Sequence, residues 1–170
     1  MAITHKKLFT TDVGSGGTPD VTFSNIPQTY DDLILLASMK TEAPGGAGSY
    51  GVRFEFNGSY SPVSFKRLYA GNGNVGSDSP SHSFLGIITG SAQSSTFSTH
   101  RLYIPNYTSS FEKISLFEGI ASQSNEYEFD TITNVWENTA AITSIRIITS
   151  VSPAYDLAQY TTISLYGIKR

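Results

Sequence analysis

Residues Leu33 to Met39 read LILLASM, and this stretch carries the clearest signal for the fold. Its apolar side chains do not alternate with polar ones, which indicates burial on both faces of a strand or on all sides of a helix. Seven residues are few for a helix, and a loop rich in glycine, Glu42 to Gly51, follows directly. We therefore predict a central strand that is covered on both faces.

Short apolar segments separated by turn residues continue on either side of this strand. Residues 52–56 alternate between apolar and charged side chains, and Asn57-Gly58 then supplies the two residues of a type I′ turn. The pattern predicts a β-hairpin whose return strand starts near Tyr60. Pro62 places that strand at a sheet edge, because proline cannot donate a ladder hydrogen bond.

The rest of the chain repeats this pattern of strand and turn. Loops are predicted at Thr10–Asp20 and at the polar run Gly71–Ser83. The further predicted strands are Ala2–Phe9, Val21–Ser24, Phe65–Tyr69, Phe84–Ile88, Thr99–Ile104, Lys113–Ala121, Tyr127–Val135, Ile142–Thr149 and Thr161–Ile168. They bring the total to about ten, and no twelve-residue stretch has a clean helical period.

These elements predict an all-β fold. We expect a single antiparallel β-sandwich, jelly-roll-like, of about 8–10 strands, spanning residues 1–170 as one domain. Residues 1–19, the first strand and its glycine-rich loop, are candidates for an arm that contacts partners.

Composition excludes several classes of function. The 170 residues include no cysteine, which removes disulfide scaffolds, thiolate zinc sites and cysteine nucleophiles. The longest apolar runs are about five residues, far below the ~20 that a membrane helix needs, and the N-terminus has no apolar signal-peptide segment. A net charge of −3 gives no strong attraction to nucleic acid or to an anionic membrane.

No motif for catalysis, cofactor binding or metal binding stands out. The histidines His5, His82 and His100 are isolated from one another, and no nucleophile elbow is present. Glu126, Glu128 and Asp130 alternate with Tyr127 and Phe129, so we expect the three carboxylates on one face of a strand and the two rings inward. Such a strip is either a cation or contact site or simply a solvated outer face.

Aromatic residues offer further candidates. Trp136, the only tryptophan, is expected to fill one end of the sandwich or to lie at a subunit contact. Gly167, next to Tyr166, permits a close approach to the backbone. Six tyrosines are expected at the surface: Tyr50, Tyr60, Tyr69, Tyr103, Tyr107 and Tyr155. They could stack on sugars, fill a subunit interface, or lie at the edge of the core with the hydroxyl in water.

Five segments together resemble a known family. They are Ile26-Pro-Gln-Thr-Tyr-Asp-Asp-Leu-Ile-Leu-Leu, Phe56-Asn-Gly-Ser-Tyr-Ser, Tyr103-Ile-Pro-Asn-Tyr, Trp136-Glu-Asn-Thr-Ala-Ala-Ile-Thr-Ser-Ile-Arg-Ile and Thr162-Ile-Ser-Leu-Tyr-Gly-Ile-Lys. In order and spacing, over residues 20 to 168, they resemble small β-sandwich virion proteins of tailed bacteriophages. The resemblance implies a structural, non-enzymatic protein of the virion, assembled in the bacterial host cytoplasm, with no active site and no cofactor.

Within that family the chain is most similar to a capsid cement, or decoration, protein, because it lacks the stalk that a tail fibre would need. The resemblance then implies a homotrimer that binds the major capsid protein and stabilises the shell, with neither nucleic acid nor membrane as a partner. Candidate contact residues are Ile3, His5, Lys6, Lys7, Phe9, Trp136 and Tyr107. Two alternatives stay open: a tail-tip or tail-fibre module that binds host polysaccharide, based on the tyrosines and Gly71–Ser83, and a glycan-cleaving enzyme, based on the acidic strip.

Overall fold

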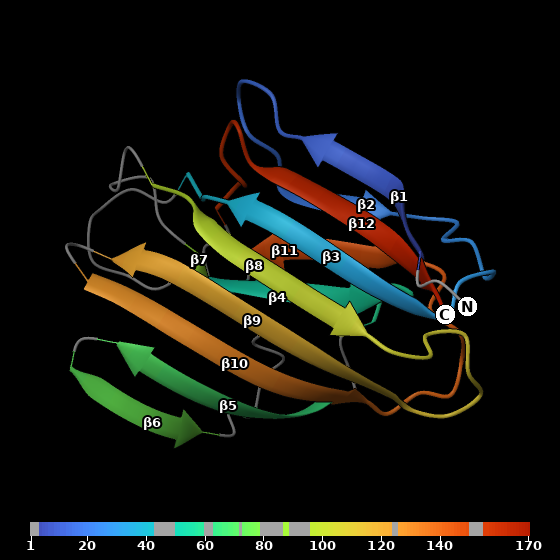
Figure 1. Cartoon of the computed structure of the whole chain (residues 1–170). Helices are drawn as coiled ribbons and strands as arrows, with labels where there is room; N and C mark the ends of the chain where they lie inside the picture. The colour runs from blue at the N-terminus through green and yellow to red at the C-terminus, as the bar shows by residue number, and fades with distance from the viewer. Residues whose placement is uncertain are drawn as a thin grey trace.

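The computed structural model describes residues 4–42, 50–59, 63–71, 73–78, 87–88, 96–123, 126–149 and 155–170, and every element in them is a β-strand (Figure 1). The strands are β1 (Thr4–Asp12), β2 (Asp20–Phe23), β3 (Asp32–Met39), β4 (Tyr50–Phe56), β5 (Val63–Gly71), β6 (Asn74–Asp78), β7 (Ile87–Ile88), β8 (Ser98–Ile104), β9 (Lys113–Gln123), β10 (Glu126–Trp136), β11 (Ile145–Thr149) and β12 (Thr162–Lys169). The predicted all-β class is therefore confirmed. No helix in these segments is long and apolar enough to span a membrane.

Two antiparallel sheets make up the sandwich, a large one of order β1-β12-β3-β8-β9-β10-β5-β6 and a small one of order β2-β11-β4-β7. Without β5, β6, β9 and β10, the orders become β1-β12-β3-β8 and β2-β11-β4-β7. The chain then changes sheet at every step except between β4 and β7, which pair with each other. This nested order is that of a jelly roll, as predicted.

Two additional strand pairs widen the large sheet beyond this jelly-roll core. β9 and β10 pair over eleven residues, and β5 joins them through β10 with β6 at the edge. In Figure 1 these four strands extend the large sheet past the small one, which lies behind β3, β8 and β12. The large sheet consequently has a broad outer face.

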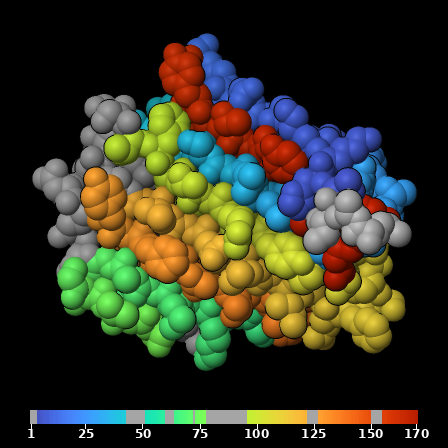
Figure 2. Space-filling model, in the orientation of Figure 1, coloured from blue at the N-terminus to red at the C-terminus, as the bar shows by residue number. Residues whose placement is uncertain are grey.

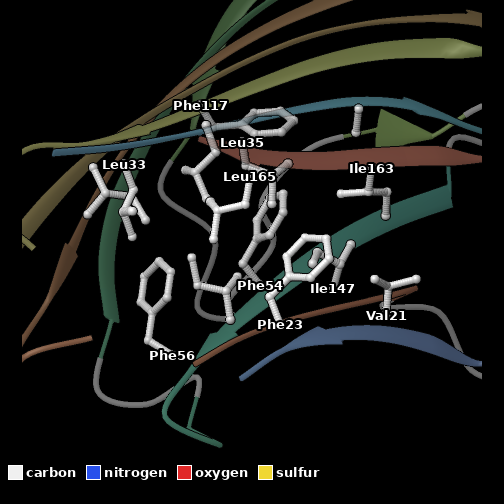
Figure 3. Close-up of a cluster of buried hydrophobic side chains, with 14 of the residues drawn as sticks. Val21, Phe23, Leu33, Leu35, Phe54, Phe56, Phe117, Ile147, Ile163 and Leu165 are labelled. Atoms are coloured by element: carbon white, nitrogen blue, oxygen red, sulfur yellow. The ribbon is translucent and has the colours of Figure 1, made fainter. Parts of the chain in front are cut away.

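The hydrophobic core lies between the two sheets (Figure 3). The facing side chains labelled there are Leu33, Leu35, Phe117, Ile163 and Leu165 on the large sheet and Val21, Phe23, Phe54, Phe56 and Ile147 on the small sheet. On β11 and β12 alternate residues are buried, as expected for strands with one face on the core.

The LILLASM strand is central, as predicted, but it is covered on only one face. Leu33, Leu35 and Met39 are buried against the small sheet. Leu36 on the opposite face is 44% exposed, because no second layer of the described chain lies outside the large sheet. The prediction of a strand covered on both faces is therefore wrong for its outer half.

The Asn57-Gly58 turn forms, but the predicted hairpin does not continue from it. Both residues have positive φ, 53° and 76°, as a type I′ turn requires, and the backbones of Phe56 and Ser59 bond to each other. β4 then pairs with β11 and β7, whereas β5, which follows the turn, pairs with β10 in the other sheet. Local turn chemistry fixed the reversal, and the partner of the next strand was set by tertiary packing.

Two predicted loops contain strand. The N-terminal strand continues to Asp12, into the loop predicted at Thr10–Asp20. The polar run Gly71–Ser83 contains β6, which pairs with β5 around a turn at Gly73. The part of that run after Asp78 lies outside the described residues.

Gly167 is a point of close approach, as predicted, and the group that approaches it is the ring of Tyr30. A Cβ on Gly167 would lie 2.4 Å from Cγ of Tyr30. Glycine therefore lets this ring lie flat on β12 and close the side of the core.

Candidate interaction surface

The outer face of the large sheet carries an apolar surface that the described chain leaves uncovered. We call it the outer-face patch, and its members are Leu36, Leu68, Val75, Ile120, Tyr127 and Phe129. Their exposed fractions run from 42% for Phe129 to 86% for Val75. These residues lie on β3, β5, β6, β9 and β10. Figure 2 views this face directly, and atoms of each of these five strands are at the surface in it.

Strand register makes the patch continuous. Ile120 on β9 lies opposite Phe129 on β10, Phe129 lies opposite Ala70 on β5, and Ala70 lies opposite Val75 on β6. Directly opposed residues of antiparallel strands share a face with Cβ atoms about 4.5–5.5 Å apart. One apolar row therefore crosses four strands.

A shallow hollow of about 380 Å³ lies in this face, lined in part by Leu36, Ile120 and Phe129. An ion pair between Arg101 and Glu118, 2.5 Å from Nη2 to Oε2, lines the same hollow and is partly exposed. An apolar centre beside charged groups is the usual anatomy of a protein–protein contact. Soluble monomers rarely expose a large contiguous apolar area without such a use.

His100 lies directly beneath this surface, on the inner side of β8. Its ring is 2% exposed, stacks on Phe117 with centroids 5.4 Å apart, and donates from Nε2 to Ser98 Oγ at 2.7 Å. The Ser98 hydroxyl in turn donates to the carbonyl of Met39. Burial lowers the pKa of His100 from 6.5 to about 3, so the imidazole stays neutral.

Acidification should therefore destabilise the fold through His100. The unfolded chain binds a proton at this imidazole below pH 6.5, and the folded chain does not until about pH 3. Between pH 7 and pH 5 the wild type should lose about 2 kcal/mol of unfolding free energy that a His100→Gln variant keeps. Urea denaturation of both proteins at the two pH values measures this difference, and parallel pH profiles would contradict it.

The N-terminal candidates lie on β1, an edge strand of the large sheet rather than a free arm. Its pairing with β12 runs from Thr4 to Asp12, with a bulge between Lys7 and Phe9. His5, Lys6 and Lys7 are exposed, and Ile3 lies outside the described residues. Phe9 is half-buried and stacks on Phe23 with ring centroids 5.4 Å apart, so this ring packs mainly against the protein's own core.

Trp136 and Tyr107 are not surface residues, and as contact candidates they are corrected by the structure. Trp136 is 1% exposed and meets Phe56 edge-on, which agrees with its alternative prediction of filling one end of the sandwich. Tyr107 is fully buried, and its hydroxyl donates to the carbonyl of Pro27. A large ring held in the chain's own core is not free to contact a partner.

The remaining tyrosines do not form one surface. Tyr69 lies on the inner side of β5, with its hydroxyl 2.5 Å from the position that a Cβ on Gly76 would take. Tyr103 donates to Asp32 Oδ2 at 3.0 Å, and Tyr155 is half-buried. Tyr60 and the side chain of Tyr50 lie outside the described residues.

The acidic strip faces the opposite way from its prediction. Asp130 is 2% exposed, and Arg67 donates to it from Nε at 2.6 Å and to Glu128 Oε1 from Nη2 at 2.5 Å. Tyr127 and Phe129, expected inward, lie on the outer face. In the described segments no group of three His, Asp or Glu side chains could hold a metal ion, and His82 lies outside them.

Sequence reasoning missed the outer-face patch, although the alternation of side chains along β10 predicts it. Trp136 and Ile132 are core residues. Because side chains alternate between the two faces of a strand, Asn134 and Asp130 share the inner face with them. This alternation places Phe129 outside. Charge alone is a poor guide to exposure on β10, because Arg67 binds Glu128 and Asp130 on the inner side.

Comparison with known proteins adds no relative: no protein family, curated protein or solved structure matches the chain.

Proposed function

We propose that this chain is a non-enzymatic virion structural protein of tailed bacteriophages, a capsid cement protein that binds the outer surface of the shell through the outer-face patch. The observation that carries the proposal is the continuous apolar row over β9, β10, β5 and β6. The virion context comes from the resemblance of the five sequence segments, and the jelly-roll order of the strands is in keeping with it.

The patch suits attachment to a preformed surface. It is wide, because two strand pairs extend the large sheet beyond the small one. Its apolar side chains stand on strands rather than loops, so little conformational entropy is lost when a partner covers them. The Arg101–Glu118 pair nearby can fix the orientation of docking.

The exposed basic residues of β1 supply a second contact. His5, Lys6 and Lys7 lie at the edge of the same sheet, where they suit an acidic part of the capsid surface. In the proposed assembly three copies meet around a symmetry axis of the shell, and each bridges neighbouring copies of the major capsid protein.

The acidic strip gives little support to the alternative of a glycan-cleaving enzyme. The enzyme hypothesis needs two carboxyl groups that can reach the scissile bond of a sugar. Glu128 and Asp130 instead bind the guanidinium of Arg67 on the inner side of β10, and Asp130 is buried. The proposal therefore keeps the chain non-enzymatic.

Co-sedimentation with matched particles tests the function. Purified protein is mixed with expanded capsids stripped of accessory proteins and, separately, with isolated tails. We expect saturable binding to capsids at a fixed ratio to the capsid protein, and no binding to tails. Binding to tails alone would overturn the proposal in favour of the tail-module alternative, and binding to neither particle would remove both.

A further inference from the structure

A pocket of about 460 Å³ opens at the end of the large sheet where β3 begins and the β8–β9 connection turns. Small-ligand sites commonly fall between roughly 300 and 1,000 Å³. Its lining combines one exposed aromatic ring with several oxygen-bearing side chains, namely Phe111, Asp31, Asn106, Thr108, Ser109 and Glu112. None of these residues belongs to the outer-face patch.

The connection that forms the pocket wall is fixed at several points. The Asn106 amide donates to Asp32 Oδ1 at 3.0 Å, and the Ile142 amide donates to the Tyr107 carbonyl at 2.9 Å. The buried ammonium of Lys113 donates to the carbonyl of Phe111. A site held in this way loses little freedom when a ligand binds.

Phe111 is 76% exposed even though its backbone is fastened to a buried lysine. A ring this exposed contributes little to the core. The face of such a ring is partially negative because of its π electrons, and it attracts the weakly positive C–H groups of an apolar ligand face.

The oxygen groups around this ring can bind hydroxyls. Asp31 is ionised, because hydrogen bonds from the Arg170 amide and from Lys169 hold the pKa of its carboxyl below 3.8. Those donors are Arg170 N at 2.6 Å and Lys169 Nζ at 3.0 Å, and they leave further lone pairs of the carboxylate open. Glu112 is exposed and lines the same pocket.

We propose that this pocket binds a neutral pyranose sugar, with one C–H face of the ring on Phe111 and its hydroxyls donating to Asp31 and Glu112. A pyranose fits this arrangement because it presents an apolar face and equatorial hydroxyls together. Hydroxyl-to-carboxylate hydrogen bonds are charge-assisted and among the stronger ones. Sugar binding here uses none of the residues of the outer-face patch.

The test uses the full chain on an array of bacterial surface oligosaccharides. Free glucose, galactose and N-acetylglucosamine are tested alongside it by saturation-transfer NMR. We expect binding of at least one neutral sugar, with affinity about tenfold or more weaker in Phe111→Ala and weakened also in Glu112→Gln. Tyr160→Ala, which removes a ring of similar exposure elsewhere, should bind as the wild type does.

The outcomes separate this proposal from other accounts. Truncating a ring that is 76% exposed should leave thermal unfolding close to that of the wild type, so loss of binding in Phe111→Ala would not reflect unfolding. Absence of any signal for the wild type, in both the array and the NMR experiment, would overturn the proposal. Binding that is equal in wild type, Phe111→Ala and Glu112→Gln would overturn it as well.

Discussion

Replacing Arg67 with methionine is expected to lower the free energy of unfolding by about 3–5 kcal/mol, because it removes the guanidinium that binds the buried carboxylate of Asp130. Arg67 donates to both Glu128 and Asp130, and Asp130 is 2% exposed. The guanidinium also lies over the ring of Tyr69, 4.6 Å from its centroid. Methionine keeps much of the volume of the aliphatic part of arginine, so the loss of stability should come from the removed charge rather than from a cavity.

Urea denaturation of wild type, Arg67→Met, Asp130→Asn and the double variant measures this effect as a double-mutant cycle. The double variant should recover a large part of the stability lost in Arg67→Met, since neutral asparagine no longer needs a cation. A loss below about 1 kcal/mol in Arg67→Met would mean that the network behaves as an exposed surface pair.

Placing glutamate at both Ile120 and Phe129 is expected to weaken capsid binding by about a hundredfold or more. These two residues lie opposite each other on β9 and β10, and both line the hollow in the outer face. Interface residues that fill such a contact commonly contribute about 2 kcal/mol or more each, and every 1.4 kcal/mol corresponds to a tenfold change in affinity. Burying two new carboxylates in the contact would add a desolvation cost.

The fold should tolerate this change. Ile120 is 51% and Phe129 is 42% exposed, so glutamate at either position reaches water in the free protein. Ser24→Glu combined with Thr29→Glu adds the same charge at exposed positions outside the patch and serves as the matched control. The control should unfold within about 1 kcal/mol of the wild type, as surface changes usually do. The patch variant should stay folded with somewhat lower stability, because its two glutamates lie directly opposite each other.

Local patterns predicted much of the strand content and the sandwich. Leu33–Met39 could be recognised as a strand from its length and apolar content. Asn57-Gly58 could be recognised as a turn because asparagine and glycine readily adopt the positive φ that a type I′ turn requires, and both do so here. These features depend on a few neighbouring residues. The jelly-roll class followed from many short strands without helical periodicity.

Long-range pairing and exposure could not be predicted in the same way. Residues 74–78, which read NVGSD, have little intrinsic preference for a strand, yet they form β6 because β5 offers an open edge. The apolar outer half of LILLASM predicts a second covering layer. An uncovered apolar sheet face produces the same pattern, and only the structure distinguishes the two.

The candidate site was the least predictable part. The sequence predicts Trp136 and Tyr107 as contact residues, but large rings also fill cores, and these two do. The sequence predicts Phe129 inward because it alternates with carboxylates, which are usually solvated. The ion pairs with Arg67, 61 and 63 residues away along the chain, reverse that assignment.

Co-sedimentation of the Ile120→Glu/Phe129→Glu variant with expanded, stripped capsids tests the central claim most directly. Wild type and the Ser24→Glu/Thr29→Glu control should saturate the capsids at the same ratio to capsid protein. The patch variant should stay in the supernatant at protein concentrations that saturate the wild type. If a folded patch variant binds capsids with wild-type affinity, the outer face of the large sheet is not the capsid-binding surface.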